Sequence, residues 1–169
     1  MTVNEQRLAR LEERVQRLED ELAITRLVAS YGPLVDAGEA EAVAGLWAPD
    51  GGYDVEGWEM SSREDIRAMV ESDGHQGLIG GGCSHFLGPV RVDVQGDEAI
   101  AVCESILVRH REGSYSVRRA GANHFHLQRG RDGWRIKHRT TRALDGSAQA
   151  RDLLGKGALG RMPGNDQPE

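Results

Sequence analysis

Hydrophobic residues recur at alternating steps of three and four near the start of the chain. Between Asn4 and Tyr31 they stand at Leu8, Leu11, Val15, Leu18 and Leu22, with arginine and glutamate between them. This is the heptad spacing of a helix that meets another surface. After Leu22 the stripe shifts to Ile24, Leu27, Val28 and Tyr31. We predict one long helix whose first part meets a partner surface and whose second part covers the core. Packing of the whole stretch on its own domain remains the alternative.

Shorter elements are expected next. Gly32-Pro33 should interrupt or kink the long helix, because proline removes a backbone donor. The chain then predicts a helix over 39–47, a turn over 49–52 and a hairpin-like pair around Gly57. Ser62 precedes an acidic first turn, which predicts a third helix to about Ser72.

The hydrophobic period changes to two after the connector Gly80-Gly81-Gly82. Strands are expected over 90–94, 100–108, 120–129 and 134–144, and folding the turn over 95–98 places Val108 opposite His85. Gly88-Pro89 predicts a bulge that re-aims His85. Helices first and long strands afterwards indicate an α+β fold with one strongly curved antiparallel sheet wrapped by helices.

Length and charge narrow the class of protein. The 169 residues, 38% of them apolar, fit one domain, which we place at 23–154, after a heptad-bearing helical extension at 1–22 and before a flexible tail at 155–169. The net charge is -6 and we find no basic aromatic-bearing stretch, so nucleic acid is not an expected partner. We see neither a secretory signal nor a membrane-length apolar run, and we expect a cytoplasmic protein.

Metal and cofactor are not expected. Cys83 and Cys103 lack zinc-ligand spacing and are interpreted as small buried thiols. His124 and His126 share one face of a strand, which a metal site can use, but no second ligand cluster with suitable spacing stands nearby.

An acid and a histidine are the main candidates for chemistry. Asp36 follows the apolar segment Pro33-Leu34-Val35 and needs a hydrogen-bond partner or water if it faces the sheet. The alternative is that Asp36 lies in a loop and is solvated. A carboxylate bonded to one imidazole nitrogen leaves the other as a base near neutral pH, and His85 is the candidate partner. Tyr31 and Tyr53 are phenol donors or amphipathic core residues.

Three further residues are candidates for the same pocket. His110 lies one pleat from the position opposite His85, or in solvent near a strand end. Arg139 and Arg142 either anchor an anionic group or lie on the surface.

Several short sequence motifs together resemble a known family. They are LVASY at 27–31, LVD at 34–36, LWAPDG at 46–51, SHF at 84–86 and DGWRI at 132–136. In this order and spacing they resemble the SnoaL-like branch of the nuclear-transport-factor-2-like superfamily, which includes scytalone dehydratase, bile-acid 7α-dehydratase and a dehydrochlorinase. The resemblance covers about residues 20–150.

The resemblance implies a cone-shaped α+β fold with an apolar pocket. It places Asp36 and His85 at the positions of the catalytic acid and histidine of the lyases in this group, and Tyr31 at the tyrosine ahead of the acid. His110 corresponds to a second histidine of one member, and Arg139 or Arg142 to an arginine on the last strand. Asn123 stands where many relatives carry tyrosine, and we count it among the substrate-binding candidates.

Two functions follow from this comparison. The first is a cofactor-independent acid-base lyase, dehydratase-like, or an isomerase or cyclase, acting on a small hydrophobic cyclic substrate. The alternative is a non-catalytic small-molecule-binding or oligomerisation module with the same fold. In either case the heptad seam and the resemblance lead us to expect a homo-oligomer, a trimer or a dimer.

Overall fold

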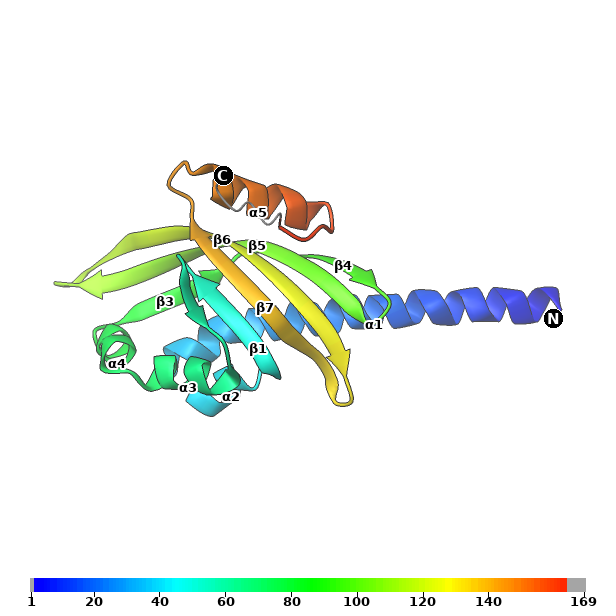
Figure 1. The fold of residues 1–169 in the computed structure, drawn as a ribbon, viewed down its shortest axis with the longest axis horizontal. Coiled ribbons are helices and arrows are strands. Elements are labelled where there is room, and N and C mark those ends of the chain that lie inside the picture. The colour runs from blue at the N-terminus through cyan, green and yellow to red at the C-terminus, as the bar shows by residue number, and fades with distance from the viewer. Residues whose placement is uncertain (1, 164–169) are drawn as a thin grey trace.

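The computed structural model describes residues 2–163 and forms one curved sheet with helices on both faces (Figure 1). The helices are α1 (Val3–Asp36), α2 (Ala40–Ala44), α3 (Arg63–Glu71), α4 (Asp73–Gly80) and α5 (Ala148–Ala158). The strands are β1 (Trp47–Val55), β2 (Trp58–Met60), β3 (Cys83–Leu87), β4 (Arg91–Gln95), β5 (Glu98–Arg111), β6 (Ser114–Gly130) and β7 (Gly133–Ala143). The predicted α+β class is confirmed.

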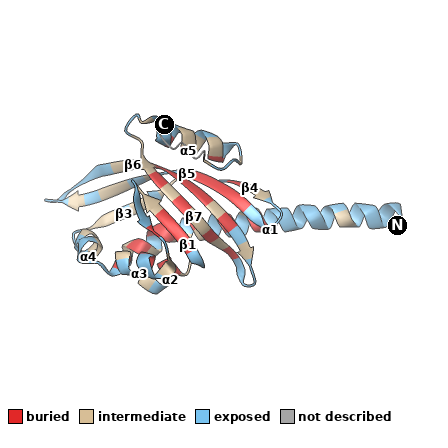
Figure 2. Ribbon diagram, in the orientation of Figure 1, coloured by how far each residue is buried: buried red, intermediate tan, exposed pale blue. Residues whose placement is uncertain are grey.

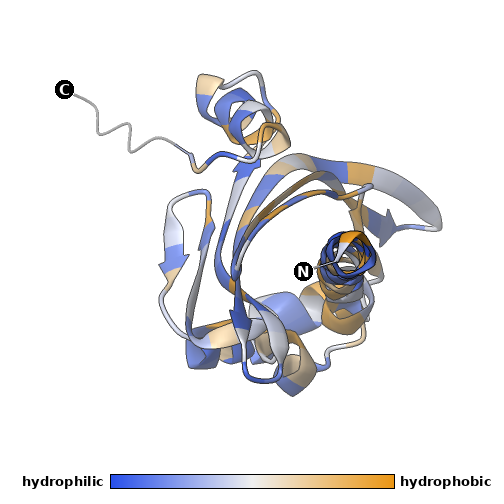
Figure 3. Cartoon of the chain, turned by 90° about the vertical axis from the view of Figure 1, so that its right-hand side faces the viewer, coloured by the Kyte–Doolittle hydropathy of each residue, from blue (hydrophilic) through white to orange (hydrophobic). Residues whose placement is uncertain are grey.

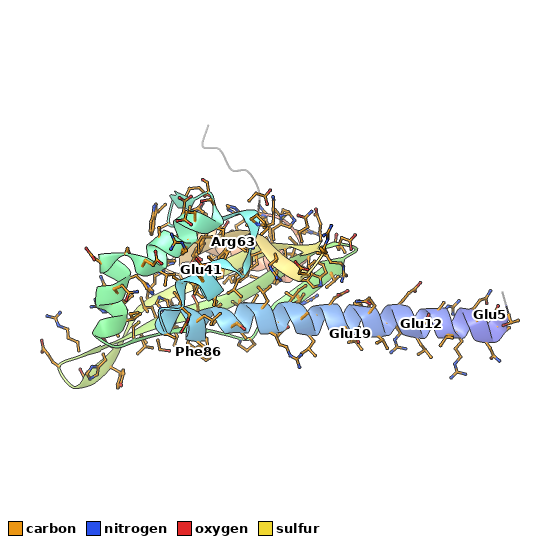
Figure 4. The ribbon with its side chains drawn as sticks, turned by 90° about the horizontal axis from the view of Figure 1, so that it is seen from below. Glu5, Glu12, Glu19, Glu41, Arg63 and Phe86 are labelled. Atoms are coloured by element: carbon orange, nitrogen blue, oxygen red, sulfur yellow. The ribbon has the colours of Figure 1, made fainter. Side chains whose placement is uncertain are left out.

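Helix α1 begins with a capping box, in which Thr2 and Glu5 each bond to the other's backbone N–H. It continues through Pro33 to Asp36, so the predicted interruption at Gly32-Pro33 is wrong. Its first half extends beyond the sheet, and Figure 4 shows Glu5, Glu12 and Glu19 along this free part. The heptad leucines there and Val15 are exposed, whereas Ile24, Val28 and Val35 are fully buried.

The sheet has the order β2-β1-β7-β6-β5-β3, and β4 also pairs with β5. All pairs are antiparallel except β1 with β7, so the sheet is mixed and not wholly antiparallel as predicted. The predicted turn over 49–52 lies inside β1, where the pairing with β7 shifts register between Trp47 and Gly52. Further shifts in β5–β6 and β6–β7 fit the strong curvature, because bulges bend and twist a sheet.

Strands β3 and β4 lie end to end along β5, separated at Gly88-Pro89, which confirms the predicted break. The break shifts the register, and His85 is opposite Leu107 instead of the predicted Val108. A one-residue shift matters because it moves a side chain to the other face of a sheet. His85 consequently faces the concave side.

The core lies between the concave face of the sheet and helices α1 to α3, where the view along α1 shows the sheet curling round it (Figure 3). The central parts of β1, β5, β6 and β7 are the most buried (Figure 2). Trp47, Phe125, Ile66 and Ile136 are fully buried in this core.

Helix α5 covers the convex face through Ala150 and Leu153, which pack with Ala122 of β6. It runs to Ala158, so the predicted flexible tail from 155 begins inside a helix, and residues 164–169 of that tail lie outside the described residues. Among the described helices none is long and apolar enough to cross a membrane.

Candidate active site

Asp36 and His85 meet although they lie 49 positions apart in the chain. The C-terminal end of α1 approaches β3 so closely that a Cβ at Gly32 would lie 2.2 Å from the carbonyl oxygen of His85. Glycine at this position therefore lets the helix bring Asp36 to the strand. Asp36 Oδ1 then lies 2.6 Å from His85 Nδ1, and Asp36 Oδ2 accepts the backbone N–H of His85 at 2.7 Å.

The two hydrogen bonds fix the His85 ring. A carboxylate oxygen accepts, so Nδ1 carries the proton and Nε2 is left as the basic nitrogen. Burial lowers the pKa of His85 below its usual value, because the imidazolium loses hydration, while the Asp36 hydrogen bond opposes this shift. His85 is therefore neutral near pH 7.

A cavity of about 160 Å³ opens beside His85. A cavity of about 150 Å³ is known to accommodate benzene, so the space suits one ring. Exposed Trp58 and Ile106 line its mouth. The wall is mainly apolar and aromatic, and its other lining residues are Tyr31, Tyr53, Val55, Met60, Met69, His75, Leu87, Ser105, Leu107, Arg119, Arg139 and Thr141.

Both predicted tyrosines line this cavity. The ring of Tyr31 lies edge-on to that of His85, with 6.4 Å between centroids, and packs at a similar distance against Tyr53. Burial raises the pKa of the Tyr31 phenol far above its usual range. Tyr31 therefore stays protonated and can donate a hydrogen bond to a bound oxygen. Thr141 donates its one hydroxyl proton to Asn123, so the Tyr53 hydroxyl donates to Thr141 Oγ1 at 3.2 Å.

Arg139 lies in the cavity wall and Asn123 lies behind it. Asn123 Oδ1 accepts from Arg139 Nη2 at 2.7 Å and from the Thr141 hydroxyl at 2.9 Å, while its amide donates to Ser105 at 2.8 Å. Asn123 is fully buried and is not among the lining residues. It can therefore orient Arg139 but does not contact a ligand in the cavity.

Two predicted site residues lie elsewhere. The ring of His110 packs at a tilt against that of Tyr115 near the tip of the β5–β6 hairpin, because the hairpin extends beyond β3. Arg142 forms a two-pronged ion pair with Asp54 of β1, since alternation along β7 turns it away from the cavity that Arg139 faces. The structure thus removes His110 and Arg142 from the candidate site.

His75 was missed by the sequence analysis and lines the cavity. Its ring lies 5.8 Å from that of His85, and its Nε2 donates to the Val35 carbonyl at 3.0 Å. His75 belongs to α4, whose three glycines concealed the helix. The available signal was Ser72, which caps α4 by accepting the His75 N–H.

Within the part of the chain that the structure describes, one group of residues has the geometry for a metal ion. Asp36, Cys83 and His85 each offer a ligand atom within 4.8 Å of the others. These atoms bond to one another instead, with Cys83 Sγ 3.4 Å from Asp36 Oδ1. Burial, with Asp36 nearby, raises the pKa of Cys83 to about 11, which keeps the thiol protonated, whereas thiolate is the metal-binding form. The residues fit acid-base chemistry better than metal coordination.

Comparison with known proteins agrees with this architecture. The family model described as a SnoaL-like domain matches residues 16–140. No curated protein matches the chain. The crystal structure of an NTF2-like protein with a cystatin-like fold from Novosphingobium aromaticivorans is 43% identical, with a TM-score of 0.85 over 87% of this chain and 96% of that one.

More distant structures share the fold alone. One is a proposed scytalone dehydratase from Novosphingobium aromaticivorans DSM 12444, 20% identical with a TM-score of 0.62 over 75% of this chain and 85% of that one. Another, from the same species, is a proposed aromatic ring hydroxylase, 23% identical with a TM-score of 0.63 over 75% and 90% of the two chains.

Proposed function

The chain belongs to the SnoaL-like domain family, and from this premise we propose that it is a cofactor-independent acid-base lyase, dehydratase-like, or an isomerase. Its substrate is a small hydrophobic cyclic molecule. The observation that carries the proposal is a neutral His85, tied to Asp36 through Nδ1, in the wall of a one-ring cavity. Nε2 of that ring bonds to no residue among those described and is free to act as a base.

The reaction begins when His85 Nε2 takes a proton from a carbon next to a carbonyl group. Asp36 accepts the Nδ1–H bond throughout, holding the ring and stabilising the imidazolium that forms. In elimination, the new C=C bond forms as the C–O bond breaks, and the imidazolium proton leaves with the hydroxyl group as water. In isomerisation, the same proton returns to another carbon.

Tyr31 has a separate role. Because its phenol stays protonated, it donates a hydrogen bond to the enolate or leaving oxygen but does not supply the proton. General acid-base catalysis contributes about 10²–10⁴ to the rate, and preorganised donors such as Tyr31 supply much of the rest.

Proton exchange in D₂O, followed by NMR, tests this proposal. The panel consists of single-ring β-hydroxy carbonyl compounds, both neutral and carboxylated. Wild-type protein should exchange the proton next to the carbonyl of at least one compound and release its dehydrated product. His85→Gln should lose both activities, whereas the matched variant His138→Gln, at a half-exposed histidine outside the cavity, should retain them. Equal exchange by wild type and His85→Gln contradicts the base assignment.

A different region of the molecule supports the expected oligomer, whether or not the cavity is catalytic. On the free part of α1, the heptad side chains Leu8, Leu11, Val15, Leu18 and Leu22 are 46–61% exposed. We propose that this face contributes to a homo-oligomer, a dimer or a trimer, because two or three heptads gain stability only against a partner. Sedimentation velocity of Leu11→Glu/Leu18→Glu should give a smaller mass than wild type, and Glu12→Ala is the control. An unchanged mass contradicts the proposal.

A further inference from the structure

Arg139 is a buried cation without a carboxylate partner. The residue is 2% exposed, and no acidic oxygen among the described residues lies within 4.0 Å of its nitrogen atoms. Nη2 donates to the neutral amide of Asn123, while Nε and Nη1 have no hydrogen-bond partner. The guanidinium group stays charged in proteins, so this charge has to be stabilised in some other way.

Aromatic rings supply part of that stabilisation. The central carbon of the guanidinium lies 4.2 Å from the ring centroid of Tyr31, 4.5 Å from that of Tyr53 and 5.0 Å from that of Phe125. Ring faces attract a cation through their quadrupoles. They do not replace the hydrogen bonds that Nε and Nη1 lack. The positive charge therefore remains only partly compensated.

The rest of the cavity adds no negative charge. Its lining contains Arg139, Arg119, His75 and His85 but no aspartate or glutamate among the described residues. Asp36 lies behind His85, and its oxygens already accept from His85 and Cys83. Arg119 at the cavity is paired with Glu56 at 3.2 Å, so Arg139 is the unpaired charge. In a low-dielectric wall, such a charge acts on a ligand through space as well as by contact.

We propose that the cavity selects organic acids, and that the substrate carries a carboxylate whose charge compensates Arg139. This inference rests on the same cavity as the proposed function and specifies its substrate class. The ring of the substrate fits the apolar wall, and the carboxylate lies toward Arg139 and the hydroxyl group of Tyr31. A permanent anion is favoured over a neutral carbonyl compound, because the cation is uncompensated even before any reaction.

Ligand-detected fluorine NMR with para-fluorobenzoate and para-fluorobenzamide tests this proposal. The two probes have nearly the same shape and differ in charge. The benzoate should bind wild-type protein in the millimolar range, at least about tenfold more tightly than the amide. Arg139→Met should lose this preference, and Arg139→Lys, which keeps the charge, should retain part of it. Arg135→Met is the matched control on the same strand, outside the cavity lining, and should bind as wild type does.

Equal binding of the two probes to wild type, no binding of the benzoate, or an unchanged preference in Arg139→Met overturns the inference. Circular dichroism establishes that each variant is folded. The lyase proposal can be refuted independently of this inference. His85→Gln should keep the preference for benzoate even though it loses turnover, because His85 is neutral. Acid-selective binding without any turnover would contradict the lyase alone, whereas turnover restricted to neutral compounds would contradict only the acid selectivity.

Discussion

Two arginines of this protein lie on aromatic rings, and only one of them has a carboxylate partner. Arg129 stacks on Trp134 at 4.6 Å and binds both oxygens of Asp20 at 2.7 Å. Arg139 lies over three rings and meets no carboxylate among the described residues. Both residues come from neighbouring strands of one sheet, so their difference lies in what the surrounding chain places opposite them.

In the Arg129 cluster, which consists of Arg129, Asp20 and Trp134, the charge of the arginine is paired, and the cluster has a structural role. Asp20 lies in α1 where the helix reaches the sheet, and it also accepts the indole N–H of Trp134 at 3.0 Å. The cluster thereby fastens α1 to β6 and β7. The Arg139 cluster leaves donors unpaired inside the protein, which costs stability and is typical of a site that awaits a ligand.

The largest expected effect is on activity, and it separates the candidate site lined by Arg139 and His85 from the Arg129 cluster. Asp36→Asn should lower turnover by about 10²–10⁴, because His85 loses the anion that orients it and stabilises its charge. Asp20→Asn should leave the turnover of folded protein within a few-fold of wild type. Steady-state kinetics on a substrate from the β-hydroxy panel measures both variants. A comparable loss of turnover in the two variants would refute the assignment of Asp36 to the active site and of Asp20 to a structural ion pair.

The next effect concerns stability, where the ion pair of Asp20 with Arg129 should matter most. Asp20→Ala should lower the free energy of unfolding by about 2 kcal/mol, because the buried ion pair is broken but Arg129 keeps some contact with solvent and with Asp97. Urea denaturation measures the change. Asp97→Ala, which removes the exposed partner of the same arginine, is the matched control and should change stability by less than about 0.5 kcal/mol.

The Asp20 contribution should also depend on pH. The hydrogen bond from Arg129 is the main reason that the pKa of Asp20 lies below its usual 3.8. Its stabilising effect is therefore complete above pH 3.8 and is lost as pH falls through the lower folded-state value. The stability gap between wild type and Asp20→Ala should close only in that acidic range.

A smaller effect is expected for the unpaired arginine. Arg139→Met should leave the free energy of unfolding unchanged or raise it by about 1 kcal/mol, because an uncompensated buried charge is replaced by an apolar chain. Asn123 keeps its bonds to Thr141 and Ser105 in this variant. Urea denaturation again gives the value. A loss as large as that in Asp20→Ala would mean that Arg139 is structural after all.

The smallest effect is a displacement of the pH profile. The proposed catalysis needs neutral His85, and burial lowers the pKa of His85 below 6.5, so kcat/KM should fall with acid only below that pH. The Asp36 hydrogen bond opposes the shift, so the acidic limb of Asp36→Asn should move to still lower pH. A limb at or above pH 6.5 in wild type would contradict this account of His85.

Much of the secondary structure followed from local pattern. The heptad stripe predicted α1, Ser62 predicted the start of α3, and the period-two runs predicted the long strands. Residue chemistry only suggested His85 as a partner of Asp36, and the family resemblance supported the pairing, because a single sequence carries no signal that links positions 49 apart.

The predictions from sequence were wrong where tertiary contacts or a helix cap outweighed the local helix propensity. Pro33 stays helical because only one backbone donor is missing, and the end of α1 is buried against β3. Helix α4 forms in spite of its glycines because Ser72 caps its N-terminus. The sequence therefore did not predict this helix, nor that it places His75 beside the cavity.

The amino-acid sequence alone determined the long helix, the break at Gly88-Pro89 and the α+β class, because hydrophobic period and backbone restriction act over a few residues. Only the tertiary structure decided that Arg139 faces the cavity while Arg142 pairs with Asp54. The two arginines are three residues apart on one strand, and which face of a strand is concave depends on register and curvature. Those properties come from the whole sheet, so no local pattern contains them.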